Sequence, residues 1–407
     1  MKKGFTLIEL LAVIVILAII ALIATPIILN IIEDTRVQSM KRSIDNYARA
    51  LETEIARKQL TEVNVTIDDA IESMQYNGSR VSCETRKILN NGEIYLDNCS
   101  VDGEVIENYS YGKKKHETSP MILTGETANN KITGYTLDKT GNIGLDIYAK
   151  VSGTSHITYS INGAAAVSVN PKKDKDGNTY YTVPVIPSDM TRSIVIKLYS
   201  GETEVDSLTT TIKDYCNTIL SNSEYSDSHE LMKAVVTFGR HNQEYFNVDK
   251  TNLADSILST PIDLSTLNLN LDYYKQYKYK VRLDEISGLS FTSSVDFAAV
   301  PKIAIYYELE NGLNIGDFTF THEGKTLTAT EGSDAYGTYY LVTIPFNYSN
   351  IINEERIIVT KDNQIETDIM APVGYALAMI QKRGFTGMGA VNASMIYYYQ
   401  EANNYYY

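Results

Sequence analysis

The chain has 407 residues, which is long for one ordinary domain, so two or three domains are expected. It carries 36 Lys and Arg against 50 Asp and Glu, and this net charge of −14 disfavours nucleic-acid binding because phosphates would be repelled. Three cysteines exclude a disulfide-dense scaffold, and the acidic exterior fits a secreted or surface protein.

The N-terminus combines a short basic start with a long apolar run. Lys2 and Lys3 precede an almost unbroken apolar stretch, Leu10–Leu29, and roughly 20 apolar residues span a bilayer core. The lysines predict a cytoplasmic start. Ala24-Thr25-Pro26 is a poor match to the small-residue cleavage site of an ordinary secretory signal. Glu9 places a carboxylate near the start of this run, where an unpaired charge is costly, so it predicts a functional role.

The segment Lys3-Gly4-Phe5-Thr6-Leu7-Ile8-Glu9 resembles the class III signal of type IV pilins and pseudopilins. The resemblance implies that a prepilin peptidase cuts after Gly4 on the cytoplasmic side and that the new N-terminal residue, Phe5, is N-methylated. It also implies that Glu9 neutralises the amine of a neighbouring subunit in the filament core. Pro26 matches a family proline where the helix is loosened on assembly, since proline removes a backbone donor. The alternative is a plain signal anchor with an accidental glutamate.

An amphipathic helix is predicted after Pro26. Apolar residues recur at three- and four-residue spacing, at Val37, Met40, Ile44, Tyr47/Ala48, Leu51 and Ile55. Polar residues such as Arg42 and Arg49 fall away from this stripe. We expect one helix from about Phe5 to Lys58, its first half in membrane or filament core and its second half on a small head domain.

Short alternating strands and a turn signal predict a small antiparallel β head from Tyr76 to Gly112. Asn90-Asn91-Gly92 splits the first two strands, and a hairpin centred on Asn91 places Cys83 opposite Cys99. Cross-strand partners are close enough for a bridge, so a Cys83–Cys99 disulfide is predicted outside the cytoplasmic membrane. The alternative is two half-buried thiols. Cys216 is expected to be a core residue on a helix.

A diverged duplication is predicted after the segment Lys113–Pro120, which we interpret as a linker rather than a polybasic membrane contact. Several pairs of segments share an offset of 160 residues: 143–147 with 303–307, 180–183 with 340–343, and 215–220 with 375–380. The predicted organisation is a leader at 1–4, a pilin-like domain at 5–112 (helix about 5–58, β head about 76–112), a linker at 113–130, a first copy at 131–248, a connecting segment at 249–290 and a second copy at 291–407.

Each copy is expected to contain alternating strands followed by two helices. The helices of the first copy are predicted at Thr211–Ser221 and Asp227–Asn247, with Asp227 and Glu230 as a capping pair. Those of the second copy are predicted at Ala371–Lys382 and about Val391–Tyr407. The fold class is therefore α+β: a long pilin helix with a small antiparallel β head, then two β-sandwich-plus-helical-hairpin units.

The C-terminal two-thirds also carries a second resemblance. Leu231–Gly239 followed by Gln243–Phe246 resembles a module of large surface proteins of Gram-positive anaerobes, in which a similar helix follows a β-sandwich with a run like Gly141–Leu145. The resemblance implies surface exposure and no defined activity.

No catalytic or metal site is predicted. The five histidines are scattered, without a metal-ligand spacing. We interpret Gly384–Gly389 as a loop between two helices, with a phosphate loop as the alternative. We interpret Asp174–Asn178 as an Asp-Gly hairpin turn, with a calcium loop as the alternative. The tyrosine runs 397–399 and 405–407 are interpreted as core packing, with stacking on sugars or packing between subunits as alternatives.

The sequence favours a non-enzymatic structural protein. The first hypothesis is a pilus subunit whose partners are other pilins and itself, a prepilin peptidase, the pilus assembly machinery and, before assembly, the membrane. The second is a minor tip pilin whose duplicated copies act as an adhesin for a host or surface ligand. Competence and type II secretion pseudopilins share the same signal. The expected location is the cytoplasmic membrane, single-pass with the head outside, and then an extracellular pilus; no cofactor is expected.

Overall fold

The computed structural model describes residues 35–60, 65–88, 94–106, 110–112, 116–310, 312–335 and 337–406. The chain divides into two compact units, Met1–Lys113 and Lys114–Tyr407, which we call the N-terminal unit and the C-terminal unit. Among the described residues, helix and strand occur in nearly equal shares, 33% and 34%, with antiparallel sheets, so the predicted α+β class is confirmed.

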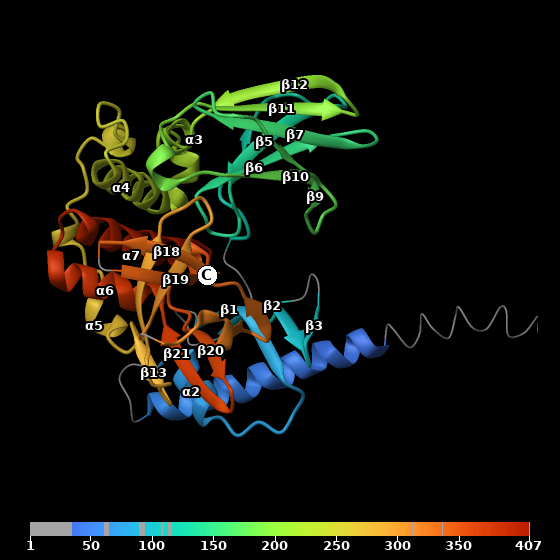
Figure 1. The fold of residues 1–407 in the computed structure, drawn as a ribbon. Coiled ribbons are helices and arrows are strands. Elements are labelled where there is room, and N and C mark those ends of the chain that lie inside the picture. The colour runs from blue at the N-terminus through green and yellow to red at the C-terminus, as the bar shows by residue number, and fades with distance from the viewer. Residues whose placement is uncertain are drawn as a thin grey trace, which may run out of the picture. The chain divides into compact units, whose positions relative to one another are not determined.

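The N-terminal unit packs one long helix on a small sheet (Figure 1). Helix α1 covers residues 35–59, and a short helix, α2 (Ile67–Ser73), follows it. The sheet is antiparallel in the order β1-β2-β3, with β1 at Val81–Ile88, β2 at Ile94–Val101 and β3 at Glu104–Val105. Cys83 pairs with Cys99 and Ile88 with Ile94, so the strand register is centred on position 91, as predicted. The tip of the hairpin, 89–93, lies outside the described residues.

The first half of the C-terminal unit, residues 116–247, is a β-sandwich followed by two helices. Its sheets have the orders β4-β5-β6-β10-β9 and β12-β11-β7-β8. The elements are β4 (Ile122–Leu123), β5 (Lys131–Leu137), β6 (Gly144–Lys150), β7 (Ser155–Ile161), β8 (Val167–Val169), β9 (Lys172–Lys173), β10 (Thr179–Pro184), η1 (Pro187–Asp189), β11 (Ile194–Ser200), β12 (Thr203–Thr210), α3 (Ile212–Leu220), η2 (Ser223–Ser228) and α4 (His229–Phe246).

The second half, residues 248–406, repeats this arrangement after a connecting segment with little regular structure. Its sheets have the orders β14-β15-β19-β18 and β13-β21-β20-β16-β17. The elements are η3 (Ala254–Ile257), η4 (Leu264–Thr266), α5 (Leu271–Tyr274), β13 (Val281–Leu283), β14 (Leu289–Asp296), β15 (Lys302–Leu309), η5 (Ile315–Asp317), β16 (Thr319–His322), β17 (Lys325–Leu327), β18 (Thr330–Asp334), β19 (Gly337–Pro345), η6 (Tyr348–Asn350), β20 (Glu355–Lys361), β21 (Gln364–Met370), α6 (Pro372–Arg383) and α7 (Met388–Tyr406).

Eight described strands of each half match in order. The order β5-β6-β10-β9 corresponds to β14-β15-β19-β18, and β12-β11-β7-β8 corresponds to β21-β20-β16-β17. The halves differ in their first short strand, because β4 extends the sheet of β5 whereas β13 pairs with β21 in the other sheet. The offset between equivalent positions is not uniformly 160. The pair Asp146–Thr182 of β6 and β10 corresponds to the pair Ala304–Thr343 of β15 and β19, so the offset is 158 residues for the first strand and 161 for the second. Turns of different length between the strands account for this difference.

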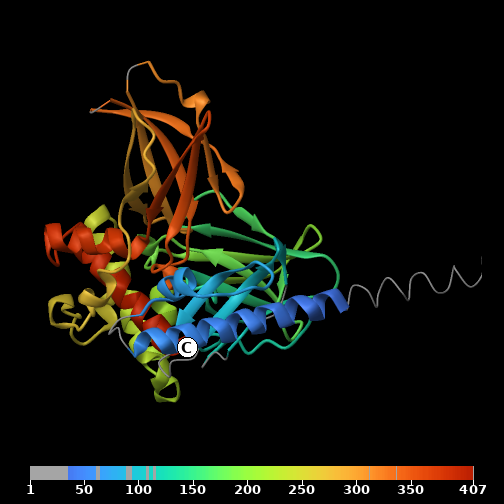
Figure 2. The ribbon, with the colours of Figure 1, turned by 90° about the horizontal axis from the view of Figure 1, so that it is seen from below.

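The helices of both halves gather at one side of the two sandwiches, where α4 packs on α7 and α6 on α7 (Figures 1 and 2). One continuous hydrophobic core runs through both halves. Phe238 on α4 and Tyr398 on α7, which are 160 residues apart, stack on each other with ring centroids 6.1 Å apart and planes 4° apart. Contact between equivalent residues is what a two-fold relation between two halves produces.

The start of α4 differs from the prediction. The N-cap is Ser228, without a side-chain capping bond, and Asp227 lies in the preceding 3-10 turn η2, so the predicted Asp227–Glu230 capping pair is wrong. The reason is that η2 runs directly into the helix and supplies backbone carbonyls to its first turn. The other three predicted helices of the C-terminal unit are present with ends shifted by one to three residues.

Candidate functional site

The residues predicted to act in processing and assembly are Gly4, Phe5, Glu9 and Pro26, and all four lie outside the described residues. Their roles therefore stay predictions. Among the helices in the described part of the chain, none combines the length and hydropathy that crossing a bilayer requires. The apolar run Leu10–Leu29 is not in that part.

Helix α1 presents the predicted apolar stripe to the sheet. Ile44, Ala48, Leu51 and Ile55 are at most 1% exposed, whereas Arg42 and Arg49 on the opposite face are exposed. Burying an aliphatic side chain contributes about 1.5–3 kcal/mol, so this stripe is the main attachment of helix to head.

One polar contact fixes the register of α1 on the sheet. Glu52 accepts hydrogen bonds from Tyr111 Oη at 3.1 Å and from the backbone N–H of Ile94 at 3.5 Å. Because Glu52 lies one turn from both Ala48 and Ile55, the polar tie sits beside the apolar stripe and the helix has one defined position along the strands.

The structure contains the predicted disulfide between Cys83 and Cys99, 16 residues apart and buried under α1. Closing a loop of about 15 residues contributes about 3 kcal/mol in the chain-entropy model. The third cysteine, Cys216, is a buried free thiol on α3, as predicted. Burial raises the pKa of the Cys216 thiol well above its usual range, so it stays a thiol and is a poor nucleophile.

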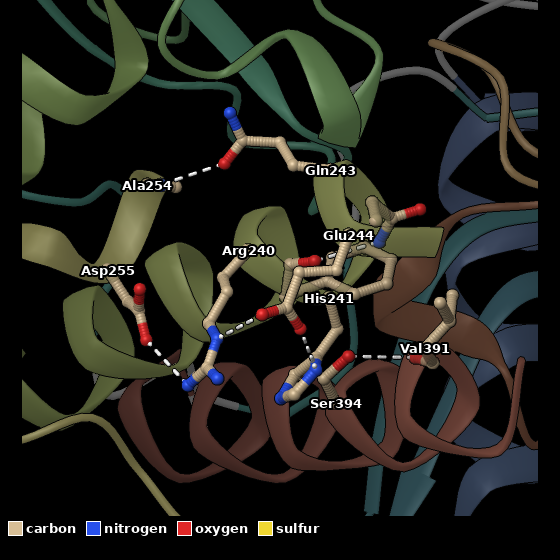
Figure 3. A network of polar contacts seen from close by, with 10 residues as sticks. Arg240, His241, Gln243, Glu244, Ala254, Asp255, Val391 and Ser394 are labelled. Atoms are coloured by element: carbon tan, nitrogen blue, oxygen red, sulfur yellow. Dashed lines mark hydrogen bonds and ion pairs between the residues drawn. The ribbon is translucent and has the colours of Figure 1, made fainter. Parts of the chain in front are cut away.

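A network of polar residues follows the last turns of α4 (Figure 3). Arg240 donates from Nε to Glu244 and from Nη1 to Asp255, both at 3.2 Å. Gln243 accepts from the backbone N–H of Ala254 at 2.8 Å and donates to the carbonyl of Asn252 at 3.1 Å. The network thus ties the connecting segment at η3 to α4.

His241 belongs to the same network but not to a reactive arrangement. Its Nδ1 lies 3.4 Å from Glu244 Oε2 (Figure 3). Burial, and then the charge of Arg240, lowers the pKa of His241 to about 4. The imidazole is therefore neutral at neutral pH, and its contacts are those of a packed interior residue.

The second sandwich holds a buried ionic cluster that the sequence reasoning missed. Arg282 donates from Nε and Nη2 to the two carboxylate oxygens of Glu366, each at 2.7 Å, and Glu366 also accepts from the backbone N–H of Ile286 at 2.6 Å. Asp368 accepts from Tyr307 Oη at 2.7 Å. Both carboxyl groups are fully buried. Burial, and then the nearby Glu366, raises the pKa of Asp368 to about 8, against the opposing effect of its bond with Tyr307.

The first sandwich has a simpler version of the Glu366 contact. Asp206 accepts from the backbone N–H of Ile132 at 2.9 Å and pairs with Lys131 at 3.2 Å. Asp206 lies opposite Leu198 and Glu366 opposite Val359, which are equivalent strand positions. In each half, therefore, a carboxylate of the last strand holds the chain that enters the other sheet. These contacts tie the last strand of one sheet to the chain that enters the other.

The first sandwich has its own buried acidic pair. Asp146 accepts from Thr182 Oγ1 at 2.7 Å and from the backbone N–H of Lys139 at 3.2 Å, while Asp138 accepts from the N–H of Thr140 at 2.8 Å. Burial, and then the charge of Asp138, raises the pKa of Asp146 to about 6. Within the described residues, no group of three or more His, Cys, Asp or Glu side chains has a metal-binding arrangement.

The comparison with known families concerns the N-terminus. Residues 1–25 match the family described as the prokaryotic N-terminal methylation motif. No curated protein matches the chain. The motif supports a type IV pilin-like or pseudopilin precursor, which implies processing by a prepilin peptidase and assembly into a pilus with other pilins. It also implies membrane anchoring followed by an extracellular pilus.

The remaining motifs singled out in the sequence are structural where they are described. Asp174 accepts from the backbone N–H groups of Asp176 and Asn178 at 3.0 and 2.8 Å, which makes a tight turn. Gly384–Gly389 joins α6 to α7. Tyr397–Tyr399, Tyr405 and Tyr406 are each at most 7% exposed and pack in the core, so these rings are not a sugar-binding surface; Tyr407 lies outside the described residues.

Proposed function

We propose that this chain is a structural subunit of a type IV pilus or pilus-like filament that polymerises through its N-terminal helix and displays the C-terminal unit outside the cell. The observation that carries the proposal is the match of residues 1–25 to the methylation motif. The helix over 35–59, seated on a disulfide-closed sheet, supports it because a filament subunit needs a helix held firmly by its head. The proposal includes no catalytic role.

Assembly would depend on a charge pair in apolar surroundings. Cleavage after Gly4 leaves a cationic amine on Phe5, and methylation keeps that charge. Glu9 would accept hydrogen bonds from the amine of a neighbouring subunit, which offsets the cost of burying both charges. Pro26 would allow the helix to loosen there, since its ring removes one backbone hydrogen bond.

The test separates processing from assembly. Glu9→Ala should abolish incorporation into surface filaments while cleavage continues, and Glu33→Ala, at the outer edge of the apolar run, is the matched control that should leave filaments unchanged. Filaments of normal abundance from Glu9→Ala would refute the assembly role. Gly4→Glu should block cleavage, and a mature-sized product would contradict the peptidase assignment.

A second candidate is a minor tip pilin that acts as an adhesin. The observation that favours it is size: the C-terminal unit, Lys114–Tyr407, is much larger than the N-terminal unit, and a bulky appendage crowds a helically packed shaft. Immunogold labelling of the C-terminal unit decides between them, because a shaft subunit labels along the filament and a tip subunit labels one end. Cells that process the protein but form no surface filament would point instead to a competence or secretion pseudopilin.

We also propose that the C-terminal unit arose by duplication of one surface-exposed module, with the domain limits given by the sequence: 5–112, a linker at 113–130, 131–248, 249–290 and 291–407. The equal strand orders and the contact between Phe238 and Tyr398 support this proposal. The segment 113–130 contains strand β4, so it contributes to the first sandwich as well as joining the units.

A further inference from the structure

The ends of α4 and α7 carry equivalent pairs of aromatic rings in different surroundings. Tyr405 and Tyr406 on α7 have centroids 5.1 Å apart at 78°, and Tyr245 and Phe246 on α4 have centroids 4.9 Å apart at 88°. The α7 pair is 7% and 6% exposed, whereas the α4 pair is 44% and 45% exposed. The same local structure is therefore covered at one place and open at the other.

The cover over the α7 pair is the chain that enters the C-terminal unit, His116–Leu123, which we call the lead-in segment. The ring of His116 stacks on Tyr405 at 4.3 Å and 7°. Tyr405 Oη donates to the carbonyl of Thr118, and the backbone N–H of His116 donates to the carbonyl of Tyr406, both at 3.3 Å. The segment thus binds the end of α7 through a ring and through its backbone.

The lead-in segment then continues along α3 to the edge of β5. Tyr215 Oη donates to the carbonyl of Pro120 at 2.5 Å. Ser119 Oγ lies 2.6 Å from Thr136 Oγ1 and accepts from the backbone N–H of Leu137 at 3.0 Å. Ile122–Leu123 finally pairs with β5 as strand β4. The segment therefore behaves as a strand added to a sheet edge.

Each side chain that holds the lead-in segment has an aromatic or hydroxyl counterpart in the other half, although Phe246 keeps the ring of Tyr406 without its hydroxyl. The counterparts are Tyr245 for Tyr405, Phe246 for Tyr406, Tyr375 for Tyr215 and Ser294 for Thr136. The last assignment follows from register, since Thr136 pairs with Asp146 and Ser294 pairs with the equivalent residue Ala304. Phe246 lies near the end of β14, because its ring centroid is 6.4 Å from that of Phe297, the residue that follows the strand.

The second half has no counterpart of the lead-in segment on this edge. The chain before β14 passes α6, where Tyr279 lies 6.0 Å from Tyr375, and then forms β13 on the other sheet. β14 is consequently the terminal strand of its sheet. Exposure agrees: Thr136 in β5 is buried, whereas Ser294 is half-buried and Thr292 is exposed. β14 has eight residues and contacts α6 over part of its length, and its outer edge pairs with no described strand, which makes it a template for another strand.

We propose that Tyr245, Phe246 and the edge of β14 form an acceptor site for an extended peptide of a partner protein. The peptide would have the chemistry of the lead-in segment: an imidazole or aromatic ring, a small hydroxyl residue three positions later, then proline and a pair of aliphatic residues. Backbone hydrogen bonds to β14 supply affinity and the ring pair supplies specificity. The site does not involve the N-terminal helix, so this proposal does not depend on the proposed role in filament assembly and can be tested separately.

The backbone geometry identifies a sharp variant. The N–H of Leu137 faces away from β6, because it donates to Ser119. Val295 pairs with Ile303 as Leu137 pairs with Leu145, so the N–H of Val295 and that of Ser293, two residues earlier, face the open edge. Ser293→Pro removes an outward donor and leaves the bonds to β15 in place, which is where a strand tolerates proline.

The experiment measures binding of a fluorescent peptide with the sequence of residues 116–124, His-Glu-Thr-Ser-Pro-Met-Ile-Leu-Thr, to the full chain in detergent by fluorescence anisotropy. We expect saturable binding that Tyr245→Ala and Ser293→Pro each weaken by about tenfold or more. Tyr245→Phe, which keeps the ring, and Ile365→Ala, an exposed apolar residue on β21, should each leave affinity within about twofold.

Three results would overturn the proposal. The first is no binding at millimolar peptide. The second is binding that neither variant weakens, which would place the peptide on the first half in exchange for the chain's own segment. The third is self-association of the chain that Tyr245→Ala abolishes, which would make the occupant a second copy. Because Tyr245 is half-exposed at a helix end, its alanine variant folds even if Ser293→Pro does not, and circular dichroism checks this.

Discussion

The two halves of the C-terminal unit share a strand order but not a polar interior. The first sandwich buries Asp138 and Asp146 beside hydroxyl and backbone donors. The second replaces Asp146 by Ala304 and instead buries Glu366 and Asp368 with an arginine and a tyrosine. Both halves keep aliphatic residues at the equivalent core positions, such as Leu145 and Ile303.

The difference shows which part of the sequence specifies the fold. Alternating apolar positions and the strand order agree between the halves and define the sandwich, although some turns differ in length. The buried polar groups differ, and each set is acceptable because its members are hydrogen-bonded to one another or to the backbone. The four changes that follow test how far the two interiors, and the two units, behave differently.

The largest effect is expected from Arg282→Ala. This change leaves Glu366 buried without its cation, and breaking a buried pair in this way costs about 3–5 kcal/mol. Lys131→Ala is the matched change in the first half, where Lys131 is 35% exposed, and should cost about 1 kcal/mol or less. Urea unfolding of the full chain in detergent measures both. Equal losses of stability would show that the two contacts are energetically alike and would contradict the difference between the two interiors.

The next largest effect concerns the disulfide of the N-terminal unit. Replacing Cys83 and Cys99 by serine should lower the stability of that unit by about 3 kcal/mol, because the unfolded loop regains its freedom. The C-terminal unit, whose described cysteine is the free thiol of Cys216, should keep its urea midpoint. Limited proteolysis in urea follows the two units separately. A parallel shift of both midpoints would mean that the units unfold together.

A smaller effect is expected from pH. The pKa of Asp368 is raised to about 8, while an unfolded aspartate titrates near pH 4, so the folded state holds the proton more tightly between these values. Its contribution to stability is complete below about pH 4 and is lost as the pH rises through about 8. From pH 6.5 to 8, wild-type stability should fall by about 1–2 kcal/mol more than that of Asp368→Asn.

The first half provides the control for this pH dependence. The pKa of Asp146 is raised only to about 6, so Asp146→Asn should alter the slope below about pH 6.5 and leave it unchanged above. Urea midpoints measured at half-unit steps of pH give both slopes. An unchanged slope in Asp368→Asn would show that Asp368 is already ionised in the folded protein.

The smallest effect is expected where the halves meet. Tyr398 Oη donates to the carbonyl of Gly141 at 3.1 Å, and its equivalent, Phe238, shows that the ring fits without a hydroxyl. Tyr398→Phe should therefore cost about 1 kcal/mol, the value of one buried hydrogen bond. Tyr340→Phe, at a half-buried ring on β19, should cost less than about 0.5 kcal/mol. A loss of several kcal/mol would mean that the hydroxyl does more than bond Gly141.

Features that depend on local pattern were predictable from the sequence. The stripe Ile44–Ile55 follows helical spacing, and the pairing of Cys83 with Cys99 follows from a turn centred on Asn91. Even so, the capping box at Thr66 and Asp69, which has a local signal, was missed, and the start of α4 was placed on Asp227 because η2 has no distinct sequence period.

Features that depend on distant partners were not predictable. Alternation along β21 would place Ile365 inside, yet Ile365 is 57% exposed and Glu366 is fully buried, because Arg282 comes from a strand 84 residues away. Strand β4 is two residues long and forms only by pairing with β5, so the local sequence of residues 113–130 predicts only a linker. The open edge of β14 becomes visible only when the two halves are compared strand by strand.

The most direct test of the central claim is mass spectrometry of the N-terminal peptide of this protein taken from sheared surface filaments. The account predicts a peptide that begins at Phe5 and carries one methyl group on its amine, because cleavage after Gly4 and N-methylation define the family whose motif residues 1–25 match. A peptide that begins at Met1, or one that begins after Ala24, would contradict it, since the first indicates a plain signal anchor and the second an ordinary secretory signal.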